Sequence, residues 1–596
     1  MPVSPSIDAE GVVRVTVRSD GVALAETIQV ISVLVSRRVN AIPSAQLVVL
    51  DGDMPGQTFP VSEKDLFKPG AAISISAGYG ETETSIFEGI VVRHGIKITG
   101  DNDTRLLVEC RDKAVRMTIG RRHANFIDQK DSDILSKLIR NHGLEAEVAA
   151  TEQSFKELVQ YGCTDWDFAL ARADANGFVV VVTDGTVRVS APQTDGEAGL
   201  KVKYGEDLME FHADVDARTQ LTSVAAVAWD PKTQDVLKSA GAGPQQLNSQ
   251  SDFSWTDLAK VAGPGEFVLR TSTPVEKAVL GTWAKAQQIK AGLARIRGRM
   301  KFQGSAKAKP GEMIELAGVG KRFSGKVFVT AVHHEIAAGN WITEAEFGLA
   351  PDWFAERPGV SAPPATNWIP AVGGLQIGVV KKLDGDPEAE NRVQVSVPVT
   401  QAEQNTVWAR LAKFYGSGSF GAFFIPEIGD EVVLGYLNED PSHPVILGSL
   451  YSSNHKPPYE LSAENNTKAI VTRCMARIEF DDDKKVITVT TPGKNKLVLS
   501  DEGKSILLQD QNNNRIEMGT GGITIDSPKD IKISAKGGIT IDAVNAISMS
   551  SKADVKSSGL NVSCDAQVGF TAKGAASAEL SASGQTVVKG AIVMIN

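Results

Sequence analysis

The sequence is poor in cysteine and in aromatic residues, and it lacks long hydrophobic runs. It has four cysteines, Cys110, Cys163, Cys474 and Cys564. They lie far apart without CxxC spacing, which favours isolated reduced thiols over a zinc site or a disulfide framework. The longest apolar runs, such as VISVLV and FVVVV, are far shorter than the ~20 residues of a membrane-spanning helix. The first residues lack a basic start followed by an apolar run, so we expect no signal peptide and assembly in the cytoplasm.

Charge and composition exclude further classes of protein. The formal net charge is -10, which repels a phosphate backbone and predicts no nucleic-acid partner. With 42% hydrophobic and 22% charged residues, the composition is that of a globular protein. A length of 596 residues suggests about three or four domains.

Most of the chain alternates apolar and polar residues, as in VVRVTV, AAISISAG and KVITVT, which predicts strands. Helical patterns occur at 131–143, 163–177 and 275–294. In the first, we expect Ser132 to be the N-cap and Gly143 to end the helix. In the second, Thr164 and Asp167 have the spacing of a helix cap. The fold is therefore predicted to be mainly β with small helical inserts.

An internal repeat divides the first 350 residues. KPGAAISISAG at 68–78 is similar to KPGEMIELAG at 309–318, and FEGIVVRHGIKI from Phe87 is similar to FSGKVFVTAVHHEI from Phe323. A Pro-Gly turn, an alternating strand and a Phe-x-Gly strand form the hairpin of a β-barrel. The repeat predicts two related barrels, with chance recurrence of Pro-Gly turns as the alternative.

The C-terminal region repeats every eight residues. GGITID at 521–526 returns unchanged at 537–542, and the residue between each apolar pair is usually polar, as at Thr524 and Lys532. Each unit is therefore expected to be a short strand with its apolar pair facing inward. Such strands are too short to surround a core alone, whereas three chains enclose one. The predicted trimer core consists of Ile523, Ile525, Ile531, Ile533, Ile539, Ile541, Ile547, Met549, Val555, Leu560, Val562, Val568 and Phe570. A two-sided roll of calcium-binding repeats is the alternative, but the GGxGxD pattern is missing.

Three segments resemble the OB-fold of the spike proteins of contractile injection machines. They are GSGSFGAFFIPEIGDEVVLGYLNEDPSHPVILGSLYSSNHKPP at 416–458, DPEAENRVQVSVP from Asp386, and WAR at 408–410. The family includes the VgrG proteins of type VI secretion, the spikes of extracellular injection particles, and the hub and spike of contractile phage tails. QYGCTDWDFALARADANGF at 160–178 resembles the helical insert of the hub, and HHEI with GNWITEAEF resembles the end of the second hub barrel.

Together, the patterns and the resemblance predict a mainly β fold. It has two hub β-barrels with small helical inserts, an OB-fold, and a C-terminal intertwined trimeric triple-stranded β-helix, or prism. The predicted domains are a hub at 1–355 with its helical insert at about 130–180, a linker at 356–373, an OB-fold at 374–460 and a trimeric β-helix spike at 461–596.

The resemblance implies a structural role without catalysis, cofactor or metal. A homotrimer would adapt a hexameric inner tube to a threefold membrane-puncturing needle, with tube and baseplate proteins at the hub end. A PAAR-type cap would cover the tip residues Ile592, Val593, Met594, Ile595 and Asn596. The chain would be made in the cytoplasm without a signal peptide, join an injection particle, and be delivered or released outside the cell, with transient contact to a target membrane.

Two alternatives remain at this point, an embedded enzyme in the first 360 residues and a trimeric receptor-binding tail fibre. GSGSFG at 416–421 fits GxGxxG, but FFIPEIG follows it rather than a helix, so a dinucleotide site is not expected. His333, His334 and Glu335 are consecutive strand residues that point to opposite faces, which argues against a metal site. The run 481–483 of three aspartates is interpreted as a charged hairpin turn. The kind of injection machine is left open.

Overall fold

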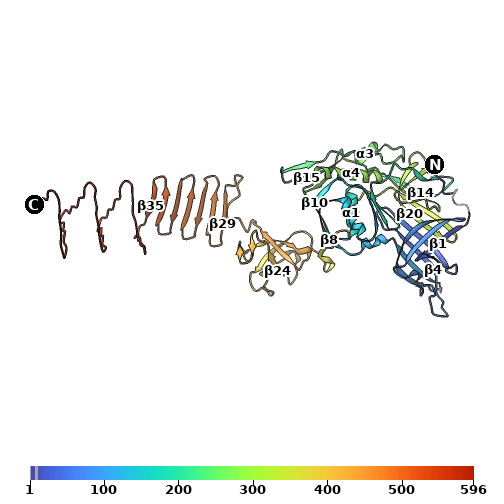
Figure 1. Ribbon diagram of the computed structural model, residues 1–596, viewed down its shortest axis with the longest axis horizontal. Coiled ribbons are helices and arrows are strands. Elements are labelled where there is room, and N and C mark those ends of the chain that lie inside the picture. The colour runs from blue at the N-terminus through green and yellow to red at the C-terminus, as the bar shows by residue number, and fades with distance from the viewer. Residues whose placement is uncertain (1, 7–10, 102, 596) are drawn as a thin grey trace. The chain divides into compact units, whose positions relative to one another are not determined.

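The computed structural model describes residues 2–6, 11–101 and 103–595 (Figure 1). The chain separates into two compact units, residues 1–450 and 451–596. The secondary structure is mainly β, as the alternating patterns predict. None of the described helices has the length and apolar character needed to cross a lipid bilayer.

A 13-stranded sheet forms the centre of the first unit. Its strands follow the order β14-β18-β21-β20-β3-β4-β7-β6-β5-β1-β2, and beside this path β13 pairs with β19, which pairs with β20. The N-terminal strands are β1 (Val13–Ser19), β2 (Val22–Ala23), β3 (Val30–Arg38), β4 (Ser44–Leu50), β5 (Ala72–Tyr79), β6 (Thr82–Ile98) and β7 (Thr104–Arg111). The later strands are β13 (Ala198–Lys203), β14 (Leu208–Val215), β18 (Ile296–Gln303), β19 (Met313–Ala317), β20 (Gly325–Ala337) and β21 (Asn340–Phe347).

Each half of this sheet has its own apolar core. Leu47, Ile75 and Phe87 belong to the core of the N-terminal half, whereas Phe302 and Val329 belong to that of the later half. The two predicted barrels are therefore joined in one sheet, because β3 pairs antiparallel with β20. The sequence does not reveal this junction, since hydrogen bonding between strand edges leaves no residue pattern of its own.

The internal repeat corresponds to two equivalent hairpins, β5–β6 and β19–β20. In the first, the Gly70 N–H donates to the Val91 carbonyl, and the Val91 N–H donates to the Ala71 carbonyl. In the second, Gly311, Val329 and Glu312 make the same pair of bonds. Gly70 and Gly311 both have positive φ, 98° and 83°, which explains a glycine at this place in both copies. The two copies thus share the same backbone hydrogen bonds, which favours related units over a chance recurrence of Pro-Gly turns.

The four described α-helices are α1 (Asp131–Arg140), α2 (Asp165–Ala175), α3 (Trp255–Ala262) and α4 (Lys277–Ala294). Three of them lie where the sequence predicts helices, whereas α3 was not predicted, and one predicted cap is wrong. Thr164 caps α2 as predicted, because its Oγ1 accepts from the Asp167 N–H at 3.0 Å. The prediction that Ser132 caps α1 is wrong: the N-cap is Lys130, and the Ser132 N–H donates to Thr151 Oγ1 instead. A hydroxyl from a distant segment thus satisfies an N–H group that a local cap usually satisfies.

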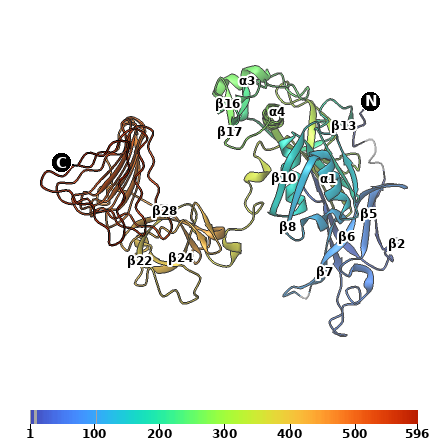
Figure 2. The same cartoon turned by 60° about the vertical axis from the view of Figure 1, so that its left-hand side comes forward.

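The helices pack against small sheets. Figure 2 shows α1 beside the two-stranded sheet of β8 (Arg122–Lys130) and β10 (Ser154–Cys163), and Phe126 of β8 shares a core with Ile134 of α1. Leu170 of α2 belongs to a second core with the sheet of β9 (Glu145–Val148), β11 (Val179–Thr183) and β12 (Thr186–Ser190). Leu280 of α4 shares a core with β15 (Val224–Asp230), which pairs with β16 (Asp235–Lys238) and β17 (Phe267–Thr271).

The first part of the predicted linker is held on the hub. The Arg121 guanidinium donates hydrogen bonds of 2.7 Å to the carbonyls of Gly162, Gly359 and Ser361. Charge-assisted bonds of this kind are stronger than those between neutral groups. Residues 359–361 are therefore fixed to the helical insert.

A closed five-stranded barrel follows. It consists of β22 (Gln376–Lys382), β23 (Val393–Ser396), β24 (Thr406–Leu411), β28 (Pro444–Ser449) and β27 (Glu431–Tyr436), in that spatial order. The GSGSFG segment forms a small hairpin of β25 (Gly416–Ser417) and β26 (Phe420–Gly421), with no helix after it. This geometry agrees with the prediction that the segment is not a dinucleotide-binding turn.

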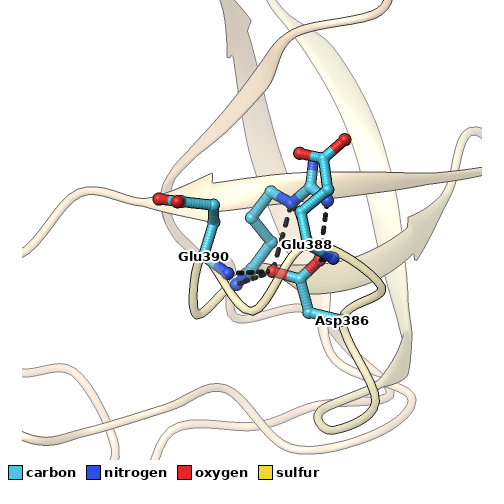
Figure 3. A network of polar contacts seen from close by, with 4 residues as sticks. Asp386, Glu388 and Glu390 are labelled. Carbon is cyan, nitrogen blue, oxygen red and sulfur yellow. Dashed lines mark hydrogen bonds and ion pairs between the residues drawn. The ribbon is translucent and has the colours of Figure 1, made fainter.

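Asp386 organises the loop between β22 and β23 (Figure 3). Its carboxylate accepts hydrogen bonds from the backbone N–H groups of Glu388, Glu390 and Arg392, and from the Arg392 guanidinium. The guanidinium, followed by the backbone donors, lowers the pKa of Asp386 far below its usual range. The DPEAENR segment is therefore an ordered loop around one ionised carboxylate.

The second unit contains a seven-stranded antiparallel sheet in which each strand pairs with the next. The strands are β29 (Thr467–Val471), β30 (Arg477–Asp481), β31 (Val486–Thr490), β32 (Lys496–Ser500), β33 (Ser505–Gln509), β34 (Arg515–Gly519) and β35 (Gly522–Asp526). Figure 1 shows these strands as a regular ladder. Residues 527–595 form no strands in the single chain, so the short strands predicted for the octads beyond β35 are not seen there.

Candidate functional site

One face of the ladder β29–β35 carries two parallel rows of apolar side chains. The paired residues of one row are Ile470, Ile478, Val489, Leu497, Leu508, Ile516 and Ile525. Those of the other are Phe480, Ile487, Leu499, Ile506, Met518 and Ile523, with Lys468 at its first position. Eleven of these apolar side chains are exposed in the single chain, from 37% at Ile516 to 70% at Ile523. A continuous apolar face of this kind marks an interaction surface.

The opposite face of the ladder mixes charged, polar and apolar side chains, the last including Val486, Val498 and Leu507. It carries charged residues in ion pairs, such as Arg477 with Glu479 and Arg515 with Asp526. Because successive side chains of a strand point to opposite faces, the alternating sequence separates the apolar rows from these charges. The ladder thus has one continuous apolar face and one face on which charged and apolar residues are mixed.

Short polar turns keep the strands in register. Lys485, Lys494, Lys504 and Asn513 adopt positive φ at four of the turns. The carboxylate of Asp510 accepts from the backbone N–H groups of two turn residues, 512 and 514. The run 481–483 also lies at a turn, where Asp481 accepts from the Lys484 N–H, as predicted for a charged hairpin. Turns built from Asp, Asn and Gly permit tight reversals at low steric cost.

Residues before Ile523 were not predicted to belong to the apolar face. A sequence signal exists, because strands begin at 467, 486 and 505, and again at 477, 496 and 515, so that each series has a period of 19 residues. This 19-residue period covers two strands and two turns. Because the composition of the turns varies, the period is harder to recognise in the sequence than the eight-residue repeat. The structure extends the candidate face towards the N-terminus by six strands, β29 to β34.

The octads continue the apolar face past β35 with a constant geometry. Ile531, Ile539 and Ile547 expose 54%, 53% and 53% of their surface. The second members of the same pairs, Ile533, Ile541 and Met549, expose 72%, 68% and 79%. Nearly equal exposure at a spacing of eight residues indicates that each octad repeats one conformation. The backbone of 527–595 has no strand partner within the chain. Because backbone groups that become buried need hydrogen-bond partners, this segment would need partners from other chains if it were buried.

The remaining predicted core and tip residues are also exposed in the single chain. Val555, Leu560, Val562, Val568 and Phe570 expose at least 61% of their surface. The tip residues Ile592, Val593, Met594 and Ile595 expose between 47% and 90%, and Asn596 lies outside the described residues. Their assignment to a trimer core and to a cap-binding tip stays a prediction.

His333 and His334 lie on opposite faces of β20. His333 contacts Glu346 at 3.3 Å, whereas His334 is buried with its Nδ1 3.0 Å from Thr343 Oγ1. Burial, followed by the charge of Arg37, lowers the pKa of His334 to about 3, so the imidazole is neutral at pH 7. Among the described residues, no group of three or more His, Cys, Asp or Glu is placed to hold a metal ion.

Two family models match the chain. The model of the Alg8 N-terminal domain matches residues 9–338, more than half of the chain. The model of the type VI secretion system/phage-baseplate injector OB domain matches residues 376–451, which include the closed barrel.

The chain is also similar to individual proteins. The type VI secretion system spike protein VgrG1b of Pseudomonas aeruginosa is 22% identical over 380 residues, covering 58% of this chain and 49% of VgrG1b. VgrG5 of the same organism is 36% identical over 115 residues, covering 18% of this chain and 14% of VgrG5. A solved structure of an Escherichia coli type VI secretion component, c3393, has a TM-score of 0.37 and 13% identity, covering 73% of this chain and 99% of that one.

The chain spans about half of VgrG1b and a smaller part of VgrG5. The family models cover both the hub sheet and the OB barrel. The chain therefore belongs to the Alg8 N-terminal domain family, and it carries in addition a segment that matches the injector OB domain.

Proposed function

We propose that the chain is the structural hub and spike of a contractile injection machine and works as a homotrimer. The observation that carries this proposal is the apolar face of β29–β35 and of the octads behind it, which a single chain leaves exposed. Burial of apolar surface contributes about 25 cal/mol per Å², so a face of this length strongly favours association.

Three copies account for this face better than two. Each octad is long enough for a strand of about three residues and a turn, and such strands would be too short for two opposed sheets to enclose a core. In a threefold prism each chain forms one wall, its apolar pairs meet those of two other chains on the axis, and its unpaired backbone groups bond to neighbouring walls. Such a needle would be stiff, because hydrogen bonds and an apolar core run along its whole length.

The hub supports a change of symmetry. Each chain contains two equivalent units, marked by the hairpins β5–β6 and β19–β20. A trimer would present six such units, which suits contact with a hexameric inner tube at one end and a threefold needle at the other. Tube and baseplate proteins are therefore the proposed partners at the hub end.

The tip requires a partner of its own. Ile592, Met594 and Ile595 are exposed, and three copies would bring them together as an apolar patch. We expect a small PAAR-type cap to cover this patch and to form the point that meets the target membrane. The proposed role is mechanical and has no catalytic step. In this role the chain is made in the cytoplasm, joins a particle, and is delivered or released outside the cell.

The first experiment is the mass of the purified full-length chain by mass photometry. The expected species has about 190 kDa, three times the 63.4 kDa of one chain. A folded monomer at all concentrations contradicts the proposal.

The second experiment tests puncture directly. Particles are assembled with the full chain or with a chain lacking 521–596, and injection into target cells is compared. The truncated spike is expected to abolish injection while the hub still joins the particle. Undiminished injection by particles that contain the truncated chain overturns the needle role.

A further inference from the structure

We propose that the hub closes into a ring by pairing β14 of one copy with the C-terminal half of β6 of a second copy. This inference rests on the proposed trimer and adds the contact that joins the hub of one chain to the next. It follows from the way in which the two equivalent units of one chain already join, through β3 and β20.

The two units have the same four-stranded order. One is β3-β4-β7-β6 and the other is β14-β18-β21-β20. Both last strands carry a register shift at the same point, between Val91 and Arg93 in β6 and between Val329 and Ala331 in β20. Tracing the paired residues strand by strand makes Val91 equivalent to Val329, Cys110 to Phe347, Ala45 to Gly298, and Val35 to Ala213. Equivalence therefore extends across all four strands.

In the two four-stranded units, the C-terminal half of β6 and the strand β14 each have an open edge whose equivalent is paired within the chain. Residues 331–337 of β20 pair with β21 on one edge and with β3 on the other. The equivalents of 331–336 are residues 93–98 of β6, which pair with β7 on one edge only. Likewise β3 has a partner on both edges, whereas its equivalent β14 pairs only with β18. Among the described residues no strand covers either open edge, and exposed edges of this kind are templates for pairing with another chain.

The junction inside the chain predicts the register between chains. Ala331 pairs with Arg38, so their equivalents Arg93 and Asp216 would lie opposite each other. The same register places Gly95 opposite Asp214, Ile96 opposite Ala213, Lys97 opposite His212, and Ile98 opposite Phe211.

Charge and hydrophobicity agree with this register. On one face, Arg93 would meet Asp216, whose carboxylate also binds the Arg218 guanidinium of its own chain at 2.8 Å. Asp214, which contacts His212 at 3.1 Å, would lie opposite Gly95 and diagonal to both Arg93 and Lys97. On the other face, Ile96 and Ile98, which are 47% and 64% exposed, would pack against Ala213 and Phe211. A shift by one residue would bring one isoleucine opposite His212 and the other opposite Asp214 or Glu210, because neighbouring strand residues point to opposite faces. The two edges are thus complementary in one register.

Engineered cysteines test the contact in the full-length chain. Ile96→Cys and Ala213→Cys are combined after the exposed native cysteines are removed by Cys474→Ser and Cys564→Ser. Opposed residues in an antiparallel pair have Cα atoms about 4.5–5.5 Å apart, within the range of a disulfide. Mild oxidation is expected to give a covalent trimer on a non-reducing gel. The matched control combines Ile96→Cys with His212→Cys, whose side chain points to the other face, and is expected to give no such product.

Charge reversal provides a second readout. Arg93→Asp is expected to slow cross-linking, and adding Asp216→Arg is expected to restore the original rate. Mass photometry of the same samples separates this inference from the proposed function. A trimer in which only the control pair cross-links, or neither does, overturns the β6–β14 contact and leaves the needle proposal intact. A monomer overturns both.

Discussion

Replacing Ile533 with alanine tests whether the octad pairs meet in a trimer core. In the single chain Ile533 is 72% exposed, so the loss of its side chain would cost under about 1 kcal/mol if it faced water in the working protein. In a closed core, the same substitution costs about 2–5 kcal/mol. A trimer contains the substitution three times, so the expected loss is about 6–15 kcal/mol per trimer.

The assay is the equilibrium between trimer and monomer, followed by mass photometry in increasing urea. Since 1.4 kcal/mol is a factor of ten, even the lower figure weakens association about 10⁴-fold. The urea midpoint of dissociation should therefore fall clearly below that of the unsubstituted chain.

Lys532→Ala is the matched control, because Lys532 is the neighbouring residue and is predicted to face solvent. Its urea midpoint is expected to stay unchanged. If Ile533→Ala and Lys532→Ala dissociate at the same urea concentration as the original trimer, Ile533 does not lie in a core, and the argument for the prism fails.

Two further predictions concern the hub. Gly304→Ala would place a Cβ 2.1 Å from the ring of the buried Trp341, so it should lower the free energy of unfolding by about 1–3 kcal/mol. Gly196→Ala is the control, because its Cβ would meet nothing within 4 Å and should leave the stability unchanged. Equal urea unfolding curves for the two variants would contradict the packing of Gly304 against Trp341. The pKa of His334 is about 3 in the folded chain and about 6.5 in the unfolded chain. Between about pH 3 and pH 6.5, the unfolded chain therefore binds a proton at His334 that the folded chain does not bind. Hub stability should therefore fall on acidification through this window, by up to about 1.4 kcal/mol per pH unit, and His334→Gln should remove that part of the slope in urea titrations at several pH values; an unchanged slope would refute the assignment.

Local sequence patterns predicted much of this fold. Alternation predicted the strands, the capping spacing of Thr164 and Asp167 predicted the start of α2, and the paired Pro-Gly motifs predicted two equivalent hairpins. The cap of α1 was mispredicted because Thr151, 19 residues away from Ser132, satisfies the backbone there. Local rules fail where a distant group supplies the hydrogen bond.

The candidate site divides in the same way. The octads show in the sequence because identical short units force the same residue types to recur every eight positions. The apolar face of β29–β34 needed the structure, because its strands are connected by turns of different composition, and only pairing brings Ile478, Leu497 and Ile516 into one row.

By itself, the sequence determined most of the strands up to β35, which of their faces are apolar, and that two hub segments are related, because these properties depend on neighbours along the chain. It did not determine the octads in this way, because the strands predicted at 527–595 do not form in the single chain. Only the tertiary structure decided that β3 pairs with β20, that both hub units share one sheet, and that β6 and β14 keep open edges. The physical reason is that strand pairing uses backbone hydrogen bonds, which every residue except proline offers alike, so the choice of partner edge depends on the packing of the whole unit.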